Sequence, residues 1–207
     1  MEFRDVVRRR RMVRVYDPDR AVPRDVVDEL LGLAVRAPSA GFTQGWRFLV
    51  LDTPASRSTY WAATTDADAE PDAWLRGMRT APVIIVAFSD ESAYVDRYAA
   101  PDKNRTAARW PIPYWHVDTG MAALLVLLGA VDAGLDACFF GVPGERWDAL
   151  RRAFAVPPRL TPVGAISLGH RAATERSRPS RGTRRPGADI VAYGTFDQPS
   201  DAFNPPS

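Results

Sequence analysis

Cysteine, lysine and histidine are all scarce in this chain of 207 residues. It has one cysteine, Cys138, one lysine, Lys103, and two histidines, His116 and His170. A single cysteine cannot form a disulfide within the chain, so we expect Cys138 to be a small buried core residue. One cysteine and two distant histidines do not make a His/Cys metal site, so no metal is expected.

The sequence also lacks an apolar run long enough to cross a membrane. The longest uncharged apolar stretch, residues 119–131, is shorter than the roughly 20 residues that a spanning helix needs. We therefore expect it to form a buried helix. No apolar export segment follows the first charged residues. These features predict a cytoplasmic protein with no membrane partner.

The common catalytic motifs are missing as well. The chain has no Gly-x-Gly-x-x-Gly, no Walker loop, no His-Glu-x-x-His and no Gly-x-Ser-x-Gly. It is, however, rich in arginine: eight lie between Arg4 and Arg24, and six between Arg171 and Arg185. Arginine forks bind phosphate and carboxylate well. This inventory suits a protein that binds and orients a cofactor, and the cofactor then carries the chemistry.

Hydrophobic periodicity predicts alternating helices and strands. Hydrophobic residues make up 46% of the chain and charged residues 25%, as in an ordinary globular domain. Expected helices cover residues 2–11, 54–65, 72–79, 117–134 and 147–154, with another opening at Pro23. Expected strands cover 12–16, 46–51, 82–88, 137–142 and 163–169. The predicted class is α+β or α/β, and the doubly apolar run 82–88 predicts a central strand.

Two motifs near the N-terminus, with shorter ones later in the chain, resemble a known family. The first is Arg10-Arg11-Met12-Val13-Arg14, and the second runs from Ala37-Pro38-Ser39-Ala40 to Gln44-Gly45-Trp46. They resemble the signature of the nitroreductase family of FMN-dependent oxidoreductases, whose usual forms are Arg-Arg-Ser-x-Arg and Ala-Pro-Ser-x-x-Asn-x-Gln-Pro-Trp. Further motifs follow in family order at residues 118–122, 133–135, 140–143 and 184–186.

The resemblance implies an α+β fold with a central mixed sheet wrapped by helices, in an interlocked homodimer with FMN at its interface. Residues 1–195 would form one FMN-binding domain and 196–207 a tail. FMN would carry the chemistry, so no catalytic side chain is assigned. The resemblance assigns the phosphate and the flavin edge to Arg10, Arg11, Met12, Arg14, Arg184 and Arg185. It places the loop of Pro38, Ser39 and Ala40 on the ring from the other subunit, and Phe140 and Gly141 beside the flavin N5.

Three residues depart from the family forms. Met12 stands where serine is usual, Phe42 where asparagine is usual, and Gly45 where proline precedes the tryptophan. The methionine removes a hydroxyl from the phosphate site. Phe42 either stacks near the flavin ring or fills the core. These departures also resemble the variation seen in the iodotyrosine deiodinase-like and dimethylbenzimidazole synthase-like branches.

The predicted function is that of an FMN-dependent oxidoreductase. It would pass hydride from NAD(P)H through FMN to a small aromatic or conjugated acceptor, such as a nitro compound or a quinone. One alternative is a flavin-binding sensor or a specialised relative from the branches just named. A more distant alternative is a basic nucleic-acid-binding module, which a net charge of only +2 and the lack of a nucleic-acid motif disfavour.

Residues 90–116 form the expected substrate lid. Aromatic, proline and charged residues are mixed there without a period, which predicts a long functional loop inserted in the domain. The substrate residues predicted from this segment and from the Pro-Ser loop are Phe42, Tyr94, Tyr98, Lys103 and Trp110. Large flat rings beside cations suit an aromatic acceptor with negative charge. The alternative is that the aromatic residues pack as core, Trp110 and Trp115 above all.

Overall fold

The computed structural model describes residues 1–66, 68–103, 110–174, 185 and 190–196. The chain divides into two compact units, Met1–Glu175 and Arg176–Ser207. Every helix and strand of the described residues lies in the first unit. The predicted domain of residues 1–195 extends beyond that unit, and its boundary stays a prediction, like that of the tail.

The first unit is built around a four-stranded antiparallel sheet with strand order β1-β2-β4-β3. The strands are β1 (Trp46–Leu51), β2 (Val83–Asp90), β3 (Asp136–Phe140) and β4 (Leu160–Gly169). The fully buried β2 lies between β1 and β4, as its apolar run predicts. The one parallel pairing of the described residues is an isolated bridge between Met12 and Ala137, so the predicted mixed character is confined to that bridge.

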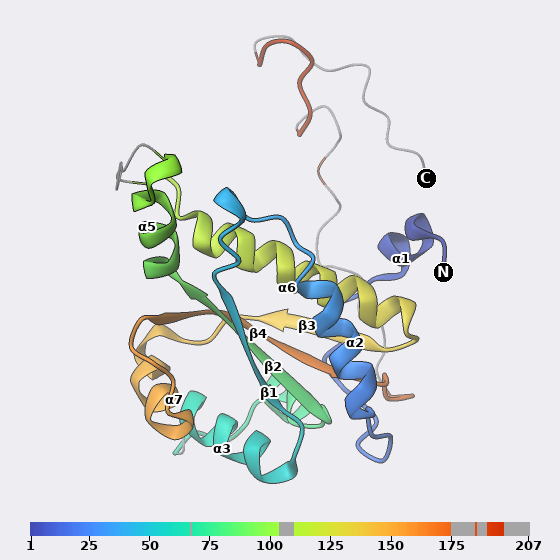
Figure 1. The fold of residues 1–207 in the computed structure, drawn as a ribbon. Helices are drawn as coiled ribbons and strands as arrows, with labels where there is room; N and C mark the ends of the chain where they lie inside the picture. The colour runs from blue at the N-terminus through green and yellow to red at the C-terminus, as the bar shows by residue number, and fades with distance from the viewer. Residues whose placement is uncertain (67, 104–109, 175–184, 186–189, 197–207) are drawn as a thin grey trace. The chain divides into compact units, whose positions relative to one another are not determined.

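Helices cover both faces of the sheet (Figure 1). Side chains of β2 alternate between two hydrophobic clusters, with Ile85 in the cluster under α2 and α6 and Ile84 in the cluster under α3 and α7. The helices are α1 (Phe3–Arg9), α2 (Arg24–Ala34), α3 (Pro54–Thr64), α4 (Ala73–Met78), α5 (Glu91–Ala99), α6 (Tyr114–Asp132) and α7 (Trp147–Phe154). Short 3-10 turns are η1 (Ala40–Phe42), η2 (Pro101–Lys103) and η3 (Gly144–Arg146). The α+β prediction is confirmed.

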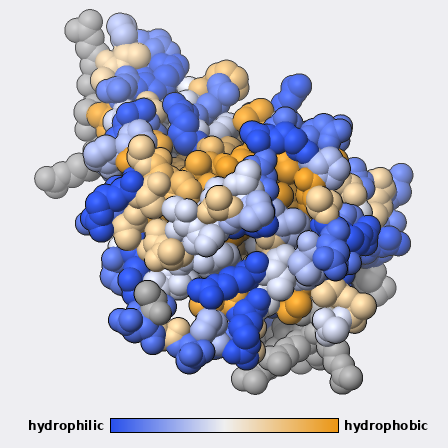
Figure 2. Space-filling model, turned by 90° about the horizontal axis from the view of Figure 1, so that it is seen from below, coloured by the Kyte–Doolittle hydropathy of each residue, from blue (hydrophilic) through white to orange (hydrophobic). Residues whose placement is uncertain are grey.

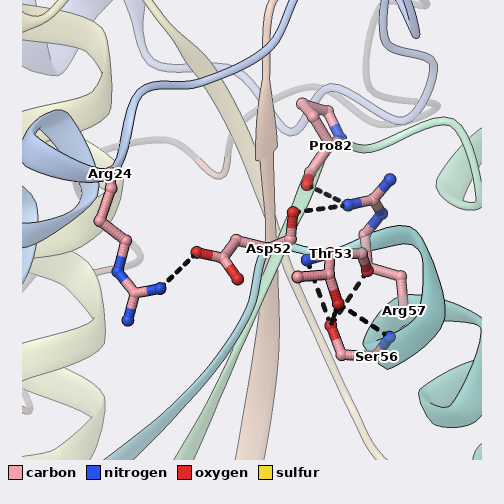
Figure 3. Close-up of polar contacts among 6 residues, drawn as sticks. All are labelled: Arg24, Asp52, Thr53, Ser56, Arg57 and Pro82. Carbon is pink, nitrogen blue, oxygen red and sulfur yellow. Dashed lines mark hydrogen bonds and ion pairs between the residues drawn. The ribbon is translucent and has the colours of Figure 1, made fainter.

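The junction between β1 and α3 is fixed by side-chain caps (Figure 3). Thr53 accepts a hydrogen bond from the Ser56 backbone at 3.1 Å, and Ser56 Oγ accepts one from the Thr53 backbone at 3.2 Å, which is a capping box. Arg57 donates to the carbonyls of Asp52 and Pro82, and Arg24 of α2 pairs with the Asp52 carboxylate at 2.7 Å. These contacts tie α2, α3 and the start of β2 to the end of β1.

The long apolar helix α6 packs on the sheet and α2 along one face. Its buried residues include Ala122, Val126 and Ala130, whereas Val117 and Leu124 are exposed. Among the described helices, α6 is the one whose length and composition would allow a membrane span. Its burial against α2 and the sheet is that of a core helix, as the sequence predicts. The helix begins at Tyr114, three residues before the predicted start.

The predicted loop at residues 90–116 is wrong in its first part. Asp90 ends β2 and caps α5, because its carboxylate accepts a hydrogen bond from the Ala93 backbone at 3.4 Å. The segment then continues through η2, and its last residues form the first turn of α6. Residues 104–109 lie outside the described residues. The Asp90 cap and the buried Tyr94 define the short helix α5. Its mixed composition shows no hydrophobic periodicity, so the sequence did not predict it.

The side of the molecule seen from below in Figure 1 is mostly hydrophilic, with hydrophobic residues showing toward its middle (Figure 2). This is the side on which α3 and α7 cover the sheet. Leu150 of α7 is fully buried, whereas Asp148 and Arg152 of the same helix are exposed. The helix α7 is therefore amphipathic, with Leu150 toward the core and its charged residues toward solvent.

A glycine of α4 permits the close approach of the segment that contains Arg14. A Cβ on Gly77 would lie 2.5 Å from the Arg14 carbonyl oxygen, which is backbone and cannot swing away. We expect Gly77→Ala to lower the free energy of unfolding by roughly 1–3 kcal/mol, as overpacking does. The measurement is equilibrium denaturation in urea.

Gly32→Ala in α2 is the matched control, because its Cβ would meet no atom within 4 Å. Alanine should there raise stability by about 0.5–1 kcal/mol, since it restricts the unfolded chain and favours helix. Equal stability changes at Gly32 and Gly77 would contradict the packing described for α4.

Candidate functional site

The arginine-rich segment after α1 lies along the edge strand β3. Met12 bridges Ala137, and the Val13 N–H donates to the Ala137 carbonyl at 3.2 Å. Buried Tyr16 then anchors the segment, donating from its N–H to Thr80 Oγ1 at 2.8 Å. Its hydroxyl donates to the Val13 carbonyl at 2.6 Å. The segment is therefore held by backbone and tyrosine contacts.

Arg10 has a buried terminal nitrogen that is suited to bind an anion. Its Nη1 is buried and has no hydrogen-bond partner among the described residues. A buried guanidinium nitrogen without an acceptor is costly, so an anionic acceptor there would be stabilising. Arg11 and Arg14 are exposed; Arg11 donates to the carbonyls of Arg8 and Arg10, and Arg14 donates to the Met12 carbonyl.

Met12 joins this segment to the end of β3. The Phe139 N–H donates to Met12 Sδ at 3.4 Å. The next residue, Phe140, stacks on Trp61 at 5.9 Å between ring centroids and meets Trp74 edge to face at 5.7 Å. Gly141 is exposed, and a Cβ there would meet no atom within 4 Å. Met12 of the predicted phosphate segment thus contacts β3 at Phe139, one residue before Phe140.

The predicted flavin loop of Pro38, Ser39 and Ala40 lies apart from the arginine-rich segment, near the start of α6. Ser39 Oγ accepts from the Gln44 N–H at 3.0 Å, and Thr43 Oγ1 donates to the Ala40 carbonyl at 2.6 Å. The Ala40 N–H donates to Asp118, near the start of α6. The N-terminal amine pairs with Asp132 at the far end of that helix, 14 residues or about 20 Å away. The loop and α1 are therefore anchored at opposite ends of α6.

Asp118 is the residue that holds this loop. Its buried Oδ2 accepts from the Ala40 N–H at 2.8 Å and from the Tyr94 hydroxyl at 2.7 Å. Burial, and then the hydrogen bond to Asp118, raise the pKa of Tyr94 above its ordinary value. The tyrosine therefore stays protonated and donates. One carboxylate oxygen joins the loop, α5 and α6.

Tyr94 is therefore misplaced among the predicted substrate residues. It is fully buried, and its ring lies so close to Gly45 that a Cβ there would approach Tyr94 Cε2 at 2.4 Å. Glycine in place of the family's proline fits this contact. The tyrosine fills the space beneath the loop and has no surface left for a substrate.

The other predicted substrate residues lie at or near the surface. Phe42 is 78% exposed, which excludes its alternative role as core. Tyr98 and Trp110 are half-buried and meet edge to face at 4.5 Å between centroids, with the Lys103 ammonium 5.3 Å from the centre of the Tyr98 ring. Trp115 is half-buried as well and tilts against Tyr94, so the aromatic residues divide between core and surface.

Two predicted cofactor residues belong to the second unit. Arg184 lies outside the described residues, and Arg185 is exposed.

Sequence reasoning missed the roles of Asp118, Arg97 and Asp102. Asp118 did carry a signal, since it is the one acidic residue in the apolar stretch from Val117 to Val131. Buried charge in such a helix needs a partner, which marks it as a structural hub.

The comparisons with known proteins bear on this arrangement. A model described as the nitroreductase family matches residues 7–170 of the 207. The chain belongs to the nitroreductase family. Its strand order, its arginine-rich segment beside β3 and its loop bound to α6 are thus features of a nitroreductase-family protein.

Individual relatives cover most of the chain. It is 30% identical to the 4-nitrobenzoate reductase of a Nocardioides species, over 89% of this chain and 86% of the relative. It is 29% identical to a protein of Methanothermobacter thermautotrophicus provisionally named NADH dehydrogenase/NAD(P)H nitroreductase, over 86% and 82%. A Desulfovibrio desulfuricans protein, provisionally named a nitroreductase and solved with FMN, is 29% identical, with a TM-score of 0.71 over 95% and 98% of the two chains.

The hub role of Asp118 is testable on stability. Asp118→Asn keeps the shape but removes the negative charge, so both hydrogen bonds lose their charge assistance, and we expect a loss of about 1–3 kcal/mol in the free energy of unfolding. Asp132→Asn on the same helix is the control, because Asp132 is exposed and such pairs contribute little. Urea denaturation of both variants measures the difference. Equal losses at the two positions would contradict the hub.

Proposed function

We propose that this protein is an FMN-dependent oxidoreductase that takes hydride from NAD(P)H and delivers it to a small aromatic or conjugated acceptor. The observation that carries the proposal is the buried Arg10 Nη1 without a partner among the described residues. It lies in an arginine-rich segment paired with β3, in a chain of the nitroreductase family. A phosphate group would supply the acceptor that this nitrogen lacks.

The residues present fit FMN. Arg10, Arg11 and Arg14 would hold the phosphate and the flavin edge, with the Met12 backbone between them. The assignment of Arg184 and Arg185 to the phosphate stays a prediction. Gly141 is exposed, and no atom lies within 4 Å of the position that its Cβ would take. The Desulfovibrio relative solved with FMN supports this assignment.

The chemistry needs little from the side chains. Bound FMN would supply the two-electron chemistry between NAD(P)H and the acceptor. The protein's own part is to bind and to orient: Arg14 would place positive charge near the ring, and the backbone at Gly141 would offer an N–H to it. The name of the Methanothermobacter relative supports NAD(P)H as the donor.

The acceptor site would lie among the surface rings. Phe42, Tyr98 and Trp110 offer apolar faces or edges, and Lys103 supplies a cation near Tyr98. This combination suits a flat acceptor with a negative group. The Nocardioides relative is named for 4-nitrobenzoate, which is such a molecule.

Flavin binding tests the proposal directly. We expect purified protein to bind close to one FMN per chain and to bleach on addition of NADPH or NADH. Arg10→Gln should weaken FMN binding roughly 10- to 100-fold, because it removes a charge-assisted contact of about 1.5–3 kcal/mol. Flavin fluorescence titration of the apoprotein measures the affinity.

Arg9→Gln is the matched control, since Arg9 is an exposed residue at the end of α1 and should leave FMN affinity unchanged. A protein that binds no FMN after incubation with it would overturn the proposed function. Full affinity in Arg10→Gln would move the phosphate site away from this segment.

We also propose that the protein acts as a homodimer. Val117 and Leu124 project as an exposed apolar pair from α6, and Phe3 and Val7 form another on the adjacent α1. The first and last turns of α6 are anchored to the loop and to the N-terminus, so this face is rigid. Residues Pro38, Ser39 and Ala40 would then reach the partner's flavin, which suits their distance from α1.

The dimer should be tight and depend on α6. An interface of an obligate kind buries more than about 2,000 Å² and leaves no stable monomer. We expect sedimentation to show a dimer at micromolar concentration, and Leu124→Glu to abolish it together with FMN binding. Val95→Glu on α5, at a residue 38% exposed, is the control and should stay dimeric. A folded wild-type monomer at micromolar concentration would refute the dimer.

A further inference from the structure

Phe42 combines high exposure with an unusual backbone. Its side chain is 78% exposed, and its φ is +55°. Gly41 and Gln44 also have positive φ, at +62° and +53°. A bulky residue in the left-handed region is a genuine outlier, and such outliers persist only where their surroundings fix them. The loop therefore holds an apolar ring in water, in a conformation that costs free energy.

Arg97 of α5 is a second side chain, besides Asp118, that holds this loop from outside it. Its Nε donates to the Gly41 carbonyl at 3.0 Å. Its two terminal nitrogens donate to the two oxygens of Asp102, both at 2.8 Å, which is a bidentate pair. The guanidinium is thus oriented on two sides. Its terminal nitrogens bind Asp102 of η2, and its Nε binds Gly41, which precedes Phe42.

The rings near the loop are already engaged with one another. Tyr98 lies against Gly41, whose Cβ would approach its Cε2 at 2.9 Å, and meets Trp110 edge to face. Trp110 in turn contacts Tyr94, Tyr114 and Trp115. No ring contact joins Phe42 to another aromatic side chain in the described part of the chain. Phe42 is therefore the ring with an unused face.

We propose that Phe42 is the residue that selects flat aromatic acceptors, and that Arg97, oriented by Asp102, is the positioning residue that holds Phe42 ready for them. The inference rests on the proposed function, and it deepens it by naming the determinant of acceptor class. An aromatic ligand that stacks on Phe42 removes the exposed apolar face of the ring from water, which stabilises the complex. A small non-aromatic acceptor gains nothing from it.

Binding and turnover of the FMN-loaded dimer test Phe42. The probes are 4-nitrobenzoate, which is flat and aromatic, and ferricyanide, which is not. We expect Phe42→Ala to raise the Kd of 4-nitrobenzoate by calorimetry, and its KM, roughly three- to tenfold, the range of an aromatic pair. The KM for ferricyanide and the FMN content should not change. Phe42→Trp should keep the aromatic acceptor within about twofold of wild type, because it keeps the ring.

A double-mutant cycle tests Arg97. If Arg97 acts through Phe42, Arg97→Gln raises the KM for 4-nitrobenzoate in the wild-type background and has no further effect in Phe42→Ala. Asp102→Asn should act in the same direction as Arg97→Gln. A residue with only a structural role would lower the melting temperature without this dependence on Phe42.

Three results would overturn the inference: an unchanged Kd and KM for 4-nitrobenzoate in Phe42→Ala, an equal loss with ferricyanide, or loss of FMN from that variant. Additive effects of Arg97→Gln and Phe42→Ala would show that Arg97 does not act through Phe42. Failure of the proposed function looks different, since the wild-type protein would then bind no FMN or fail to oxidise NAD(P)H. In that case this inference fails with it.

Discussion

The architecture around the candidate site depends on one buried carboxylate, that of Asp118. Its Oδ2 accepts hydrogen bonds from a loop, through Ala40, and from α5, through Tyr94. A buried charge without donors would be strongly destabilising, so neither partner can leave without cost to the other. The start of α6 therefore becomes a fixed point, against which the loop before β1 and the helix after β2 are both positioned.

The opposite situation holds at the arginine-rich segment. Its backbone is satisfied by β3 and its Tyr16 is buried, yet Arg10 keeps a buried nitrogen without an acceptor among the described residues. The two regions therefore differ: the buried acceptor at Asp118 is satisfied by two donors, whereas the buried Arg10 nitrogen is the donor that the proposed phosphate would satisfy. Phe42 belongs to the first region. Hydrogen bonds with Asp118 and Arg97 hold the backbone beside Phe42, and its ring is exposed.

Much of the fold could be predicted from periodicity. The apolar run of β2 indicated a central strand, and hydrophobic periodicity indicated helices at the positions of α2 and α7. The region from Asp90 to Trp115 was harder, because its helix α5 is short and its period is set by a single buried residue, Tyr94. A capping aspartate after a strand was the available signal. Composition alone also could not separate Tyr94, which is core, from Tyr98, which is near the surface.

The sequence by itself determined most of the order of elements, though not α5, together with the arginine-rich segment, the Pro-Ser loop and hence the family, because these are local patterns read along the chain. Only the tertiary structure decided which side chains meet: that Asp118 binds Ala40 and Tyr94, that Arg97 reaches Gly41, and that Phe42 faces solvent. These pairs are separated by 24 to 78 residues. Hydrogen bonds of that range depend on how strands and helices pack, which no local pattern encodes.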